Sequence, residues 1–137
     1  MFLLKPWLPK EAVICDGLGY RIKVRPPRTS VIGRSIYLHG ILEKEVTNIA
    51  QEKIKKGWNI LDIGADVGYY SLLFASKCGP KGKVAAFEPD PEAIPYLNDN
   101  ISMFEYSNID MYDFALFNHV GHGMMKQGGR GQVYPNE

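Results

Sequence analysis

The sequence predicts an α/β fold in which helices flank a parallel sheet and a small β-hairpin precedes it. Three observations support this prediction. Between residues 58 and 116, short apolar runs typical of strands alternate with longer segments of helical period. Strands separated by helices in this order imply parallel pairing through right-handed crossovers. A length of 137 residues suits one domain with a core of its own.

The N-terminal part is expected to be the hairpin. Residues 12–25, AVICDGLGYRIKVR, predict two short strands around a turn, and the second strand alternates apolar and basic residues with the period of a half-buried strand. Two prolines then end the pattern. We therefore assign 1–40 to a hairpin extension, 41–126 to the sheet-and-helix half-domain and 127–137 to a flexible Gly-rich tail.

The half-domain supplies the alternation of strand and helix. Apolar residues at helical spacing predict a helix over 41–56, and the later pattern predicts strands at 58–63, 83–88 and 108–116 with helices at 68–78 and 90–104. The strands are largely apolar on both faces, as parallel strands buried on both sides are. Pro95 lies about one turn into the last helix, so an irregular first turn is expected there. Beyond residue 116 at most one short strand is predicted, around Met124 and Met125.

The charged residues and the cysteines indicate which kinds of partner and which compartment to expect. Sixteen basic and 15 acidic residues leave a net charge of +1, which points to neither nucleic acid nor a membrane surface. Residues 21–34 carry five basic side chains and no acid, a pattern that fits a solvated surface or an anionic partner. Cys15 and Cys78 stand in no metal-binding spacing, so we expect free thiols and a cytoplasmic protein. The apolar start of the chain is short and broken by prolines, unlike a signal peptide or an anchor.

The stretch ILDIGADVGYY at 60–70 predicts a ligand site. Ligands of open parallel sheets bind beyond the carboxyl ends of the strands. Gly64 and Gly68 lack a Cβ, so the backbone there can turn sharply and approach a ligand closely. Glu88 ends the next strand, where an acceptor-only carboxylate can bind the two hydroxyls of a ribose.

The residues of this turn favour one nucleotide ligand over another. A pyrophosphate site calls for three glycines in the pattern G-x-G-x-x-G at a helix N-terminus. Here two glycines stand in D-x-G-x-x-x-G, and Asp62 and Asp66 would repel a pyrophosphate. Acids beside a glycine turn favour a ligand with a cationic group and a ribose. S-Adenosylmethionine has both, and we prefer it to a dinucleotide as the cofactor.

Residues 60–101, ILDIGADVGYYSLLFASKCGPKGKVAAFEPDPEAIPYLNDNI, resemble class I S-adenosylmethionine-dependent methyltransferases with a Rossmann-like sheet, and most of all the FkbM family. That family shows D-x-G-A-x-x-G-Y-Y, then G-P-x-G-x-V, then F-E-P-D-P, and all three occur here in this order. The resemblance extends from about residue 21 to 125. It implies S-adenosyl-L-methionine as cofactor and a hydroxyl of a small molecule or saccharide as methyl acceptor. The cofactor-binding residues that it implies are Asp62, Gly64, Ala65, Asp66, Gly68, Glu88, Pro89, Asp90, Asp113, Phe114, Ala115 and Leu116.

The resemblance also implies a role for each group of these residues. The turn 62–68 would line the methionine and ribose side, with an Asp at 66 where the family most often has Asn. Glu88 would bind the ribose hydroxyls, and residues 89–90 would lie beside the adenine. Residues 114–116 would close on the adenine ring. Polar contacts there would come from Asp113 or Asn118.

Other interpretations of single residues stay open. Glu88 could be a solvated acid at a strand end. Tyr69 and Tyr70 fit packing on a helix better than catalysis. His119 and His122 are three residues apart but lack the further ligands of a metal site, and we predict none.

The sequence predicts a donor-binding half without an acceptor-binding half. The resemblance implies a fourth strand with a K-x-D-x-E-G-A-like signature and three more strands, and none follows residue 116. We therefore expect a sheet that stops after its third core strand, with one side of the first strand uncovered and open to self-association. No catalytic residue is predicted.

Two functions remain. One is a methyltransferase or its donor-binding part, and the other is a non-catalytic S-adenosylmethionine-binding or interaction module. A nucleic-acid methyltransferase is less favoured, because the sequence has no N-P-P-Y- or D-x-N-P-like element.

Overall fold

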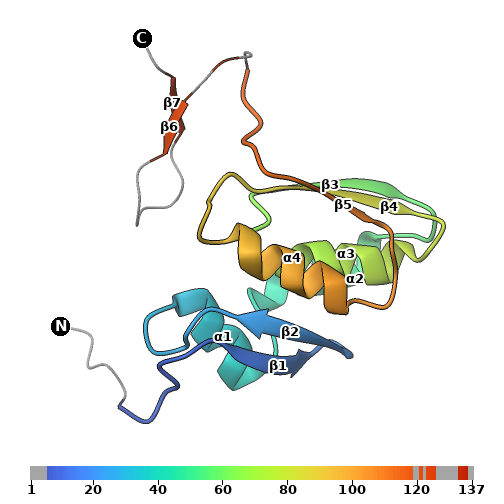
Figure 1. Cartoon of the computed structure of the whole chain (residues 1–137). Helices are drawn as coiled ribbons and strands as arrows, with labels where there is room; N and C mark the ends of the chain where they lie inside the picture. The colour runs from blue at the N-terminus through green and yellow to red at the C-terminus, as the bar shows by residue number, and fades with distance from the viewer. Residues whose placement is uncertain (1–5, 119–120, 122, 126–132, 136–137) are drawn as a thin grey trace.

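The computed structural model describes residues 6–118, 121, 123–125 and 133–135. Its main body has three layers: a parallel sheet, a layer of helices, and an N-terminal hairpin on the far side of those helices (Figure 1). The sheet has the order β3-β4-β5, with β3 at Asn59–Ile63, β4 at Lys83–Phe87 and β5 at Ile109–Tyr112. The helices α3 (Tyr69–Cys78) and α4 (Ile94–Met103) follow β3 and β4. The predicted strand-helix-strand-helix-strand order is confirmed.

The N-terminal part contains the predicted hairpin and one helix that was not predicted. The hairpin pairs β1 (Val13–Gly17) with β2 (Tyr20–Val24) in antiparallel register. Helix α1 (Val31–His39) follows, and its N-cap is Ser30, whose Oγ accepts a hydrogen bond of 2.9 Å from the Gly33 amide. Gly40 ends it in a left-handed conformation with φ 66°. Ser30 and Gly40 are residue types typical of helix ends, so the sequence contains signals for both ends of α1.

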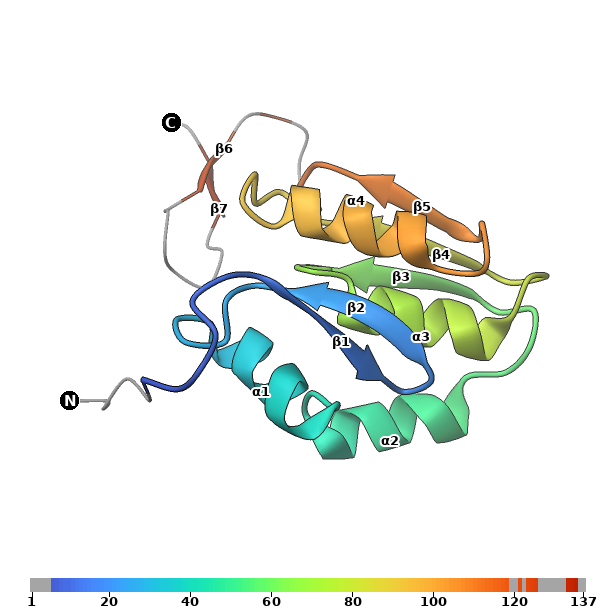
Figure 2. The same ribbon diagram turned by 60° about the horizontal axis from the view of Figure 1, so that its bottom comes forward.

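Helix α2 (Lys44–Lys53) lies beside α3 and is shorter than the predicted 41–56 (Figure 2). It begins after Glu43, which has a left-handed backbone with φ 42°, and it ends before Ile54, which is extended. Gly57, with φ +83°, then turns the chain into β3.

Helix α4 begins four residues later than predicted. Residues 91–93 form a turn, so Pro95 occupies the first helical turn, where no backbone donor is required. The expected irregular start is confirmed. Asp90 closes the turn, because its carbonyl accepts from the amides of Ala93 and Ile94 and its Oδ1 accepts from that of Glu92.

The two faces of the sheet differ in burial. On the face toward α3 and α4, Val84 and Ala86 are fully buried and Ile109 is 8% exposed. On the other face, Leu61 and Ile63 are 63% and 64% exposed, and no described element lies over them. The prediction that the strands are buried on both faces is therefore wrong for this part of the chain.

The hairpin is attached to the outer side of α4 through Asn100. The Asn100 Oδ1 accepts from the Lys23 amide at 2.6 Å, and its Nδ2 donates to the carbonyls of Lys23 at 2.8 Å and Val67 at 2.7 Å. Asn100 is fully buried, so these bonds replace its lost hydration. Ile22 and Val24 consequently join the same core cluster as the sheet and helices.

The last described segments form a second small hairpin. Strand β6 (Gly123–Met125) pairs with β7 (Val133–Pro135), so the strand predicted around Met124 and Met125 is present. The predicted flexible tail 127–137 lies outside the described residues except for β7. Across the described part of the chain, no helix is both long and apolar enough to cross a membrane.

Candidate functional site

The turn after β3 is held against the end of β4. The amides of Gly64 and Ala65 both donate to the Phe87 carbonyl, at 2.9 and 3.0 Å. Gly64 and Gly68 are left-handed, with φ 85° and 90°, as is Asp66 with φ 48°. Asp is one of the few residue types with a side chain that tolerate this conformation. The sequence thus folds here into a tight turn at the carboxyl end of the sheet.

The two glycines serve different purposes. A Cβ on Gly64 would meet nothing within 4 Å, so this position faces open space that a ligand can enter. A Cβ on Gly68 would lie 2.7 Å from the Leu97 Cδ1, so this position is needed for the close packing of α4.

Glu88 connects the loop after β3 with the loop after β4. Its Oε2 accepts from the Asp66 amide and its Oε1 from the Asp90 amide, each at 2.7 Å. The residue is 6% exposed, so the interpretation as a solvated acid is wrong. Burial raises the pKa of Glu88, with a further increase from the charges of Asp66 and Asp90, and the two amide bonds oppose this rise. Each carboxylate oxygen keeps a second lone pair that a ribose hydroxyl could use.

Asp62 points from β3 toward the helix layer. It is 8% exposed, and its Oδ2 accepts from the Ser71 hydroxyl at 2.6 Å. Burial raises the pKa of Asp62, and the hydrogen bonds from Ser71 oppose the rise. Asp62 therefore fixes the start of the turn to α3.

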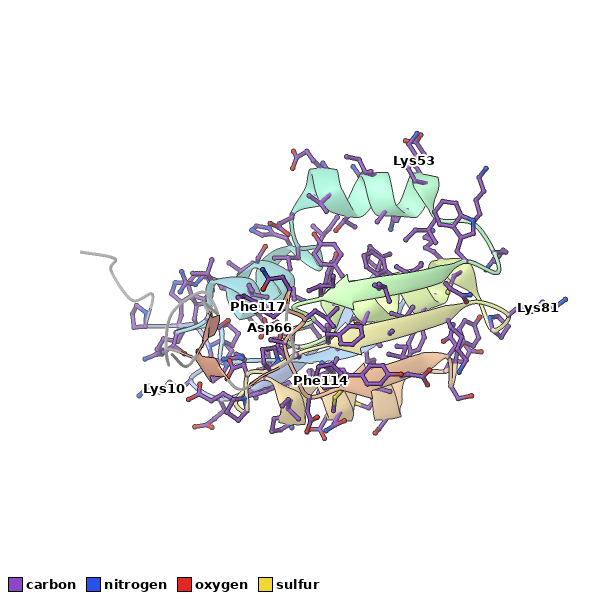
Figure 3. All side chains as sticks on the ribbon, turned by 90° about the horizontal axis from the view of Figure 1, so that it is seen from above. Lys10, Lys53, Asp66, Lys81, Phe114 and Phe117 are labelled. Atoms are coloured by element: carbon purple, nitrogen blue, oxygen red, sulfur yellow. The ribbon has the colours of Figure 1, made fainter. Side chains whose placement is uncertain are left out.

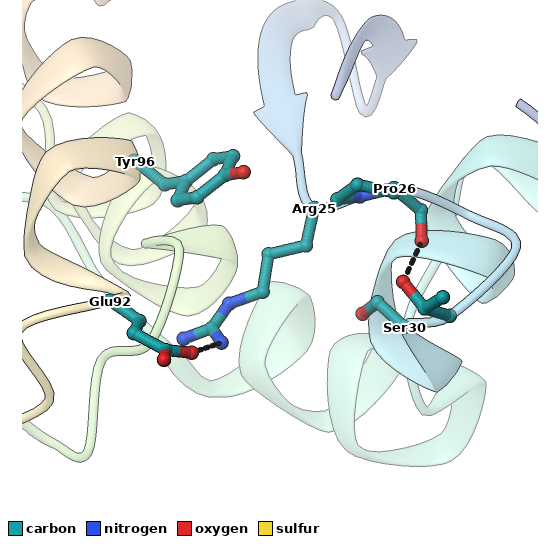
Figure 4. A pocket seen from close by; sticks show the side chains of 6 residues that line it. Arg25, Pro26, Ser30, Glu92 and Tyr96 are labelled. Atoms are coloured by element: carbon teal, nitrogen blue, oxygen red, sulfur yellow. Dashed lines mark hydrogen bonds and ion pairs between the residues drawn. The ribbon is translucent and has the colours of Figure 1, made fainter. Parts of the chain in front are cut away.

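Arg25 is the site residue that the sequence reasoning missed. Its Nη2 lies 3.0 Å from both Asp66 Oδ1 and Asp90 Oδ2, and its Nη1 lies 3.8 Å from Glu92 Oε2. The guanidinium also lies over the Tyr96 ring, 6.0 Å from its centroid. Figure 4 shows the side chain extending from β2 between Tyr96 and Glu92. The only signal in the sequence was a basic segment without acids of its own.

A hollow of about 560 Å³ opens beside this cluster. Its lining residues are Arg25, Pro26, Thr29, Ser30, Glu92 and Tyr96. None of the sequence-predicted cofactor residues lines it. The hollow thus adjoins the predicted site through Arg25 and is separate from the glycine turn.

The other basic side chains of residues 21–34 are also largely used within the chain. Lys23 pairs with Asp99 at 2.6 Å. Arg28 donates to the carbonyls of Pro6 and Leu8, and Arg34 donates to those of Pro27 and Arg28. This segment therefore binds the chain's own acids and carbonyls, and the anionic-partner interpretation gains no support from it.

Residues 113–116 follow β5 at the same end of the sheet as the turn. Figure 3 shows Asp66 and Phe114 toward this end and Lys81 at the opposite end. Phe114 is 50% exposed and makes edge contacts with Phe87 and Tyr112, at ring-centroid distances of 5.6 and 5.8 Å. These aromatic contacts lie on the open face of the sheet. The structure thus brings together Asp62 to Gly68 and Glu88 to Asp90, with the 113–116 segment at their edge.

The remaining candidates have structural roles or lie outside the described residues. Tyr69 is 2% exposed, and the Tyr70 hydroxyl donates to Glu43 at 2.9 Å, so the prediction of packing on α3 is confirmed. Burial raises the pKa of Tyr70 to about 12, and the bond to Glu43 adds to the rise. His119 and His122 are outside the described residues. Within the described part, no group of three or more potential metal ligands comes together.

The chain is similar in sequence to known methyltransferases, although no family model matches it. It is 37% identical over 57 residues to protein-L-isoaspartate O-methyltransferase of Methanococcoides burtonii, a match of 42% of this chain and 28% of the relative. It is 30% identical over 71 residues to a probable cobalt-precorrin-6B C(15)-methyltransferase (decarboxylating) of Sulfolobus acidocaldarius, which covers 52% of this chain and 37% of the relative.

A solved structure shows the same fold. TYW2 of M. jannaschii in complex with AdoMet superposes with a TM-score of 0.58 and 20% identity, over 74% of this chain and 42% of that one. The chain thus spans well under half of the length of each of these relatives. They belong to methyltransferase families other than FkbM. The fold of the described parallel sheet and its helices is that of the class I S-adenosylmethionine-dependent methyltransferases.

Proposed function

We propose that this chain is the donor-binding part of an S-adenosylmethionine-dependent methyltransferase. The proposal rests on one observation, the hydrogen-bonded contact between the glycine turn and the Glu88 carboxylate. Gly64 faces open space, and the Glu88 carboxylate beside it has lone pairs left after its two amide bonds. A nucleoside in that space would meet a backbone without a side chain and an acceptor for its ribose hydroxyls.

The charge of the site supports S-adenosylmethionine over a dinucleotide. Asp66, Glu88 and Asp90 stand within one hydrogen-bonded unit, which repels a pyrophosphate and attracts a sulfonium. TYW2 of M. jannaschii, which has the same fold, was solved with AdoMet.

The finer proposal is an FkbM-type enzyme that transfers the methyl group to a hydroxyl of a small molecule or saccharide in the cytoplasm. It rests on the three motifs D-x-G-A-x-x-G-Y-Y, G-P-x-G-x-V and F-E-P-D-P between residues 62 and 91. The free thiols of Cys15 and Cys78 support the location. Methyl transfer depends on positioning of the acceptor, and we assign no general base in this chain.

The alternative is a non-catalytic S-adenosylmethionine-binding or interaction module. It stays open because we assign no general base among the described residues. A methyl-transfer assay on mixed hydroxylated acceptors separates the two. Turnover supports the enzyme, and binding without turnover supports the module.

The binding test uses calorimetry with the whole chain. We expect S-adenosylmethionine to bind and NAD to give no signal. Glu88→Gln should weaken binding roughly ten- to a hundredfold, because a hydrogen bond to a charged acceptor contributes about 1.5–3 kcal/mol. Glu105→Gln, at an exposed acid after α4, is the matched control. NAD binding without a response to the methyl donor would overturn the proposal.

We also propose that a second copy of the chain pairs with the free edge of β3. In the described structure β3 is the outer strand of the sheet, and its Leu61 and Ile63 are exposed. Two such edges are self-complementary about a twofold axis, since each supplies the donors and acceptors that the other lacks.

A further inference from the structure

Arg25 belongs to a different layer from the predicted cofactor residues, yet its guanidinium reaches them. It follows β2 of the N-terminal hairpin, whereas Asp66 and Asp90 lie at the carboxyl end of the sheet. A single nitrogen, Nη2, lies 3.0 Å from a carboxylate oxygen of each acid. The sequence separations of 41 and 65 residues make this a tertiary contact between the hairpin and the site.

Arg25 binds the side chains of two acids, and the backbone amides of the same two residues donate hydrogen bonds to Glu88. Asp66 and Asp90 each donate a backbone N–H to Glu88 and each offer a side-chain oxygen to Arg25. Two carboxylates, those of Asp66 and Asp90, therefore contact one cation, with that of Glu92 as a third at 3.8 Å. The charges of Asp66 and Asp90 add to the raised pKa of the buried Glu88, and the guanidinium that is bound to both acids offsets these charges.

The orientation of Arg25 is set by these carboxylates. Its side chain is 24% exposed, and its buried Nε has no hydrogen-bond partner among the described residues. A buried N–H without a partner is destabilising, so the ion pairs must outweigh that cost. A lysine has one point charge in place of the planar fork and would reproduce this arrangement only in part.

We propose that Arg25 is a positioning residue of the donor site, which holds Asp66 and Asp90 on either side of Glu88 so that their amides orient that carboxylate for the ribose hydroxyls. This inference rests on the proposed function. It makes the N-terminal hairpin a component of the nucleoside site, although the hairpin lies outside the sheet-and-helix unit.

A neighbouring ion pair provides the matched control. Lys23 lies two residues earlier in β2 and pairs with Asp99 of α4 at 2.6 Å. It also lies over Tyr96, 5.7 Å from the ring centroid. Lys23 thus links the same strand to the same helix but contacts none of the acids around Glu88. Lys23→Gln removes one ion pair of the hairpin. Arg25→Gln also removes ion pairs of the hairpin, and in addition it removes the positive charge beside Asp66 and Asp90.

The experiment measures binding of 5′-methylthioadenosine to the whole chain between about pH 5.5 and 8. This probe carries the ribose and adenine but no charge, so direct attraction of a sulfonium does not contribute. In wild type, affinity falls when Glu88 becomes protonated. In Arg25→Gln we expect the fall to begin at higher pH than in wild type, with roughly tenfold weaker binding where the two profiles differ most. Arg25→Lys should be intermediate, and Lys23→Gln should follow wild type.

The outcomes separate this inference from the function on which it rests. Wild type that binds neither the probe nor S-adenosylmethionine overturns the proposed function and this inference with it. Wild type that binds while Arg25→Gln keeps its pH profile overturns this inference alone, as does an equal loss in Lys23→Gln. If Arg25→Gln does not fold, the Arg25→Lys profile decides: an upward shift supports the proposal and an unchanged profile contradicts it.

Discussion

The two faces of the parallel sheet have similar apolar sequences and different surroundings. Neighbouring residues of β3 and β4 alternate between them, so that Val84 and Ala86 are fully buried under the helices while Leu61 and Ile63 are more than half exposed. Hydrophobicity alone therefore does not distinguish the faces. What distinguishes them is whether α3 and α4, which follow the strands directly in the chain, pack on that side.

The difference shows which face of the sheet is covered by helices of the chain itself. The helices that follow β3 and β4 cover one face within about 45 residues of chain, and the turn and Glu88 are built by the same elements. An apolar row with large exposure marks a surface that is suited to a partner.

The largest difference is expected in stability. Leu97→Ala removes a fully buried side chain of α4 and should lower the free energy of unfolding by about 2–5 kcal/mol. Leu61→Ala on the open face, where the side chain is 63% exposed, should change it by about 0.5 kcal/mol or less. Urea unfolding monitored by circular dichroism measures both. Similar losses would mean that the open face is covered in solution.

The two glycines of the turn offer a smaller contrast. Gly64→Ala and Gly68→Ala both place a side chain in the left-handed region, at a cost of about 1–2 kcal/mol each. Gly68→Ala also drives its Cβ against Leu97, so we expect it to destabilise by about 1–3 kcal/mol more. Thermal unfolding of the two variants gives the comparison. An equal loss would show that α4 can move away from the turn.

Self-association should depend on β3, the outer strand of the sheet. Leu61→Glu places a charge on β3 without touching the buried core and should weaken pairing of two copies about tenfold, or about 1.4 kcal/mol. Light scattering across a concentration series measures the change. Glu105→Gln is the surface control. A wild-type chain that stays monomeric at every concentration would refute the proposed pairing.

The smallest effect concerns the pH dependence of stability on the covered face. Burial raises the pKa of Asp62 above its ordinary value of 3.8, so the folded state retains a proton that the unfolded chain has lost. The free energy of unfolding should therefore fall as pH rises from about that value through the raised pKa. Asp62→Asn should flatten this slope in part, as unfolding at several pH values would show. An equal flattening by Asp110→Asn on the open face would contradict the assignment to Asp62.

Local patterns were sufficient to predict the order of strands and helices in the parallel sheet. Short apolar runs and helical spacing placed these elements, and the position of Pro95 correctly indicated an irregular helix start. Two glycines and an acid at the next strand end located the turn and Glu88, because strand ends of a parallel sheet meet at one edge. These features depend on residues close together in the chain.

The errors arose from caps that were overlooked and from contacts between distant segments. Helix α1 has a Ser30 N-cap and a Gly40 end, but residues 1–40 were assigned to a hairpin extension with no helix. The partners of Arg25 are 41 and 65 residues away, and no local period encodes them. The apolar pattern of β3 could not show that one of its faces would lack a covering layer within the described residues.

The bonds between Lys23 and Asn100 have a consequence for the order of events during synthesis. The two residues are 77 positions apart, so the hairpin cannot dock until that stretch has been translated. At about 5–20 residues per second, the nascent chain waits on the order of 4–15 s for its partner. Until then Ile22 and Val24, fully buried in the finished protein, lack the part of their core cluster that lies later in the chain. The hairpin is therefore translated before the residues on which it docks and is among the last segments to reach its final environment.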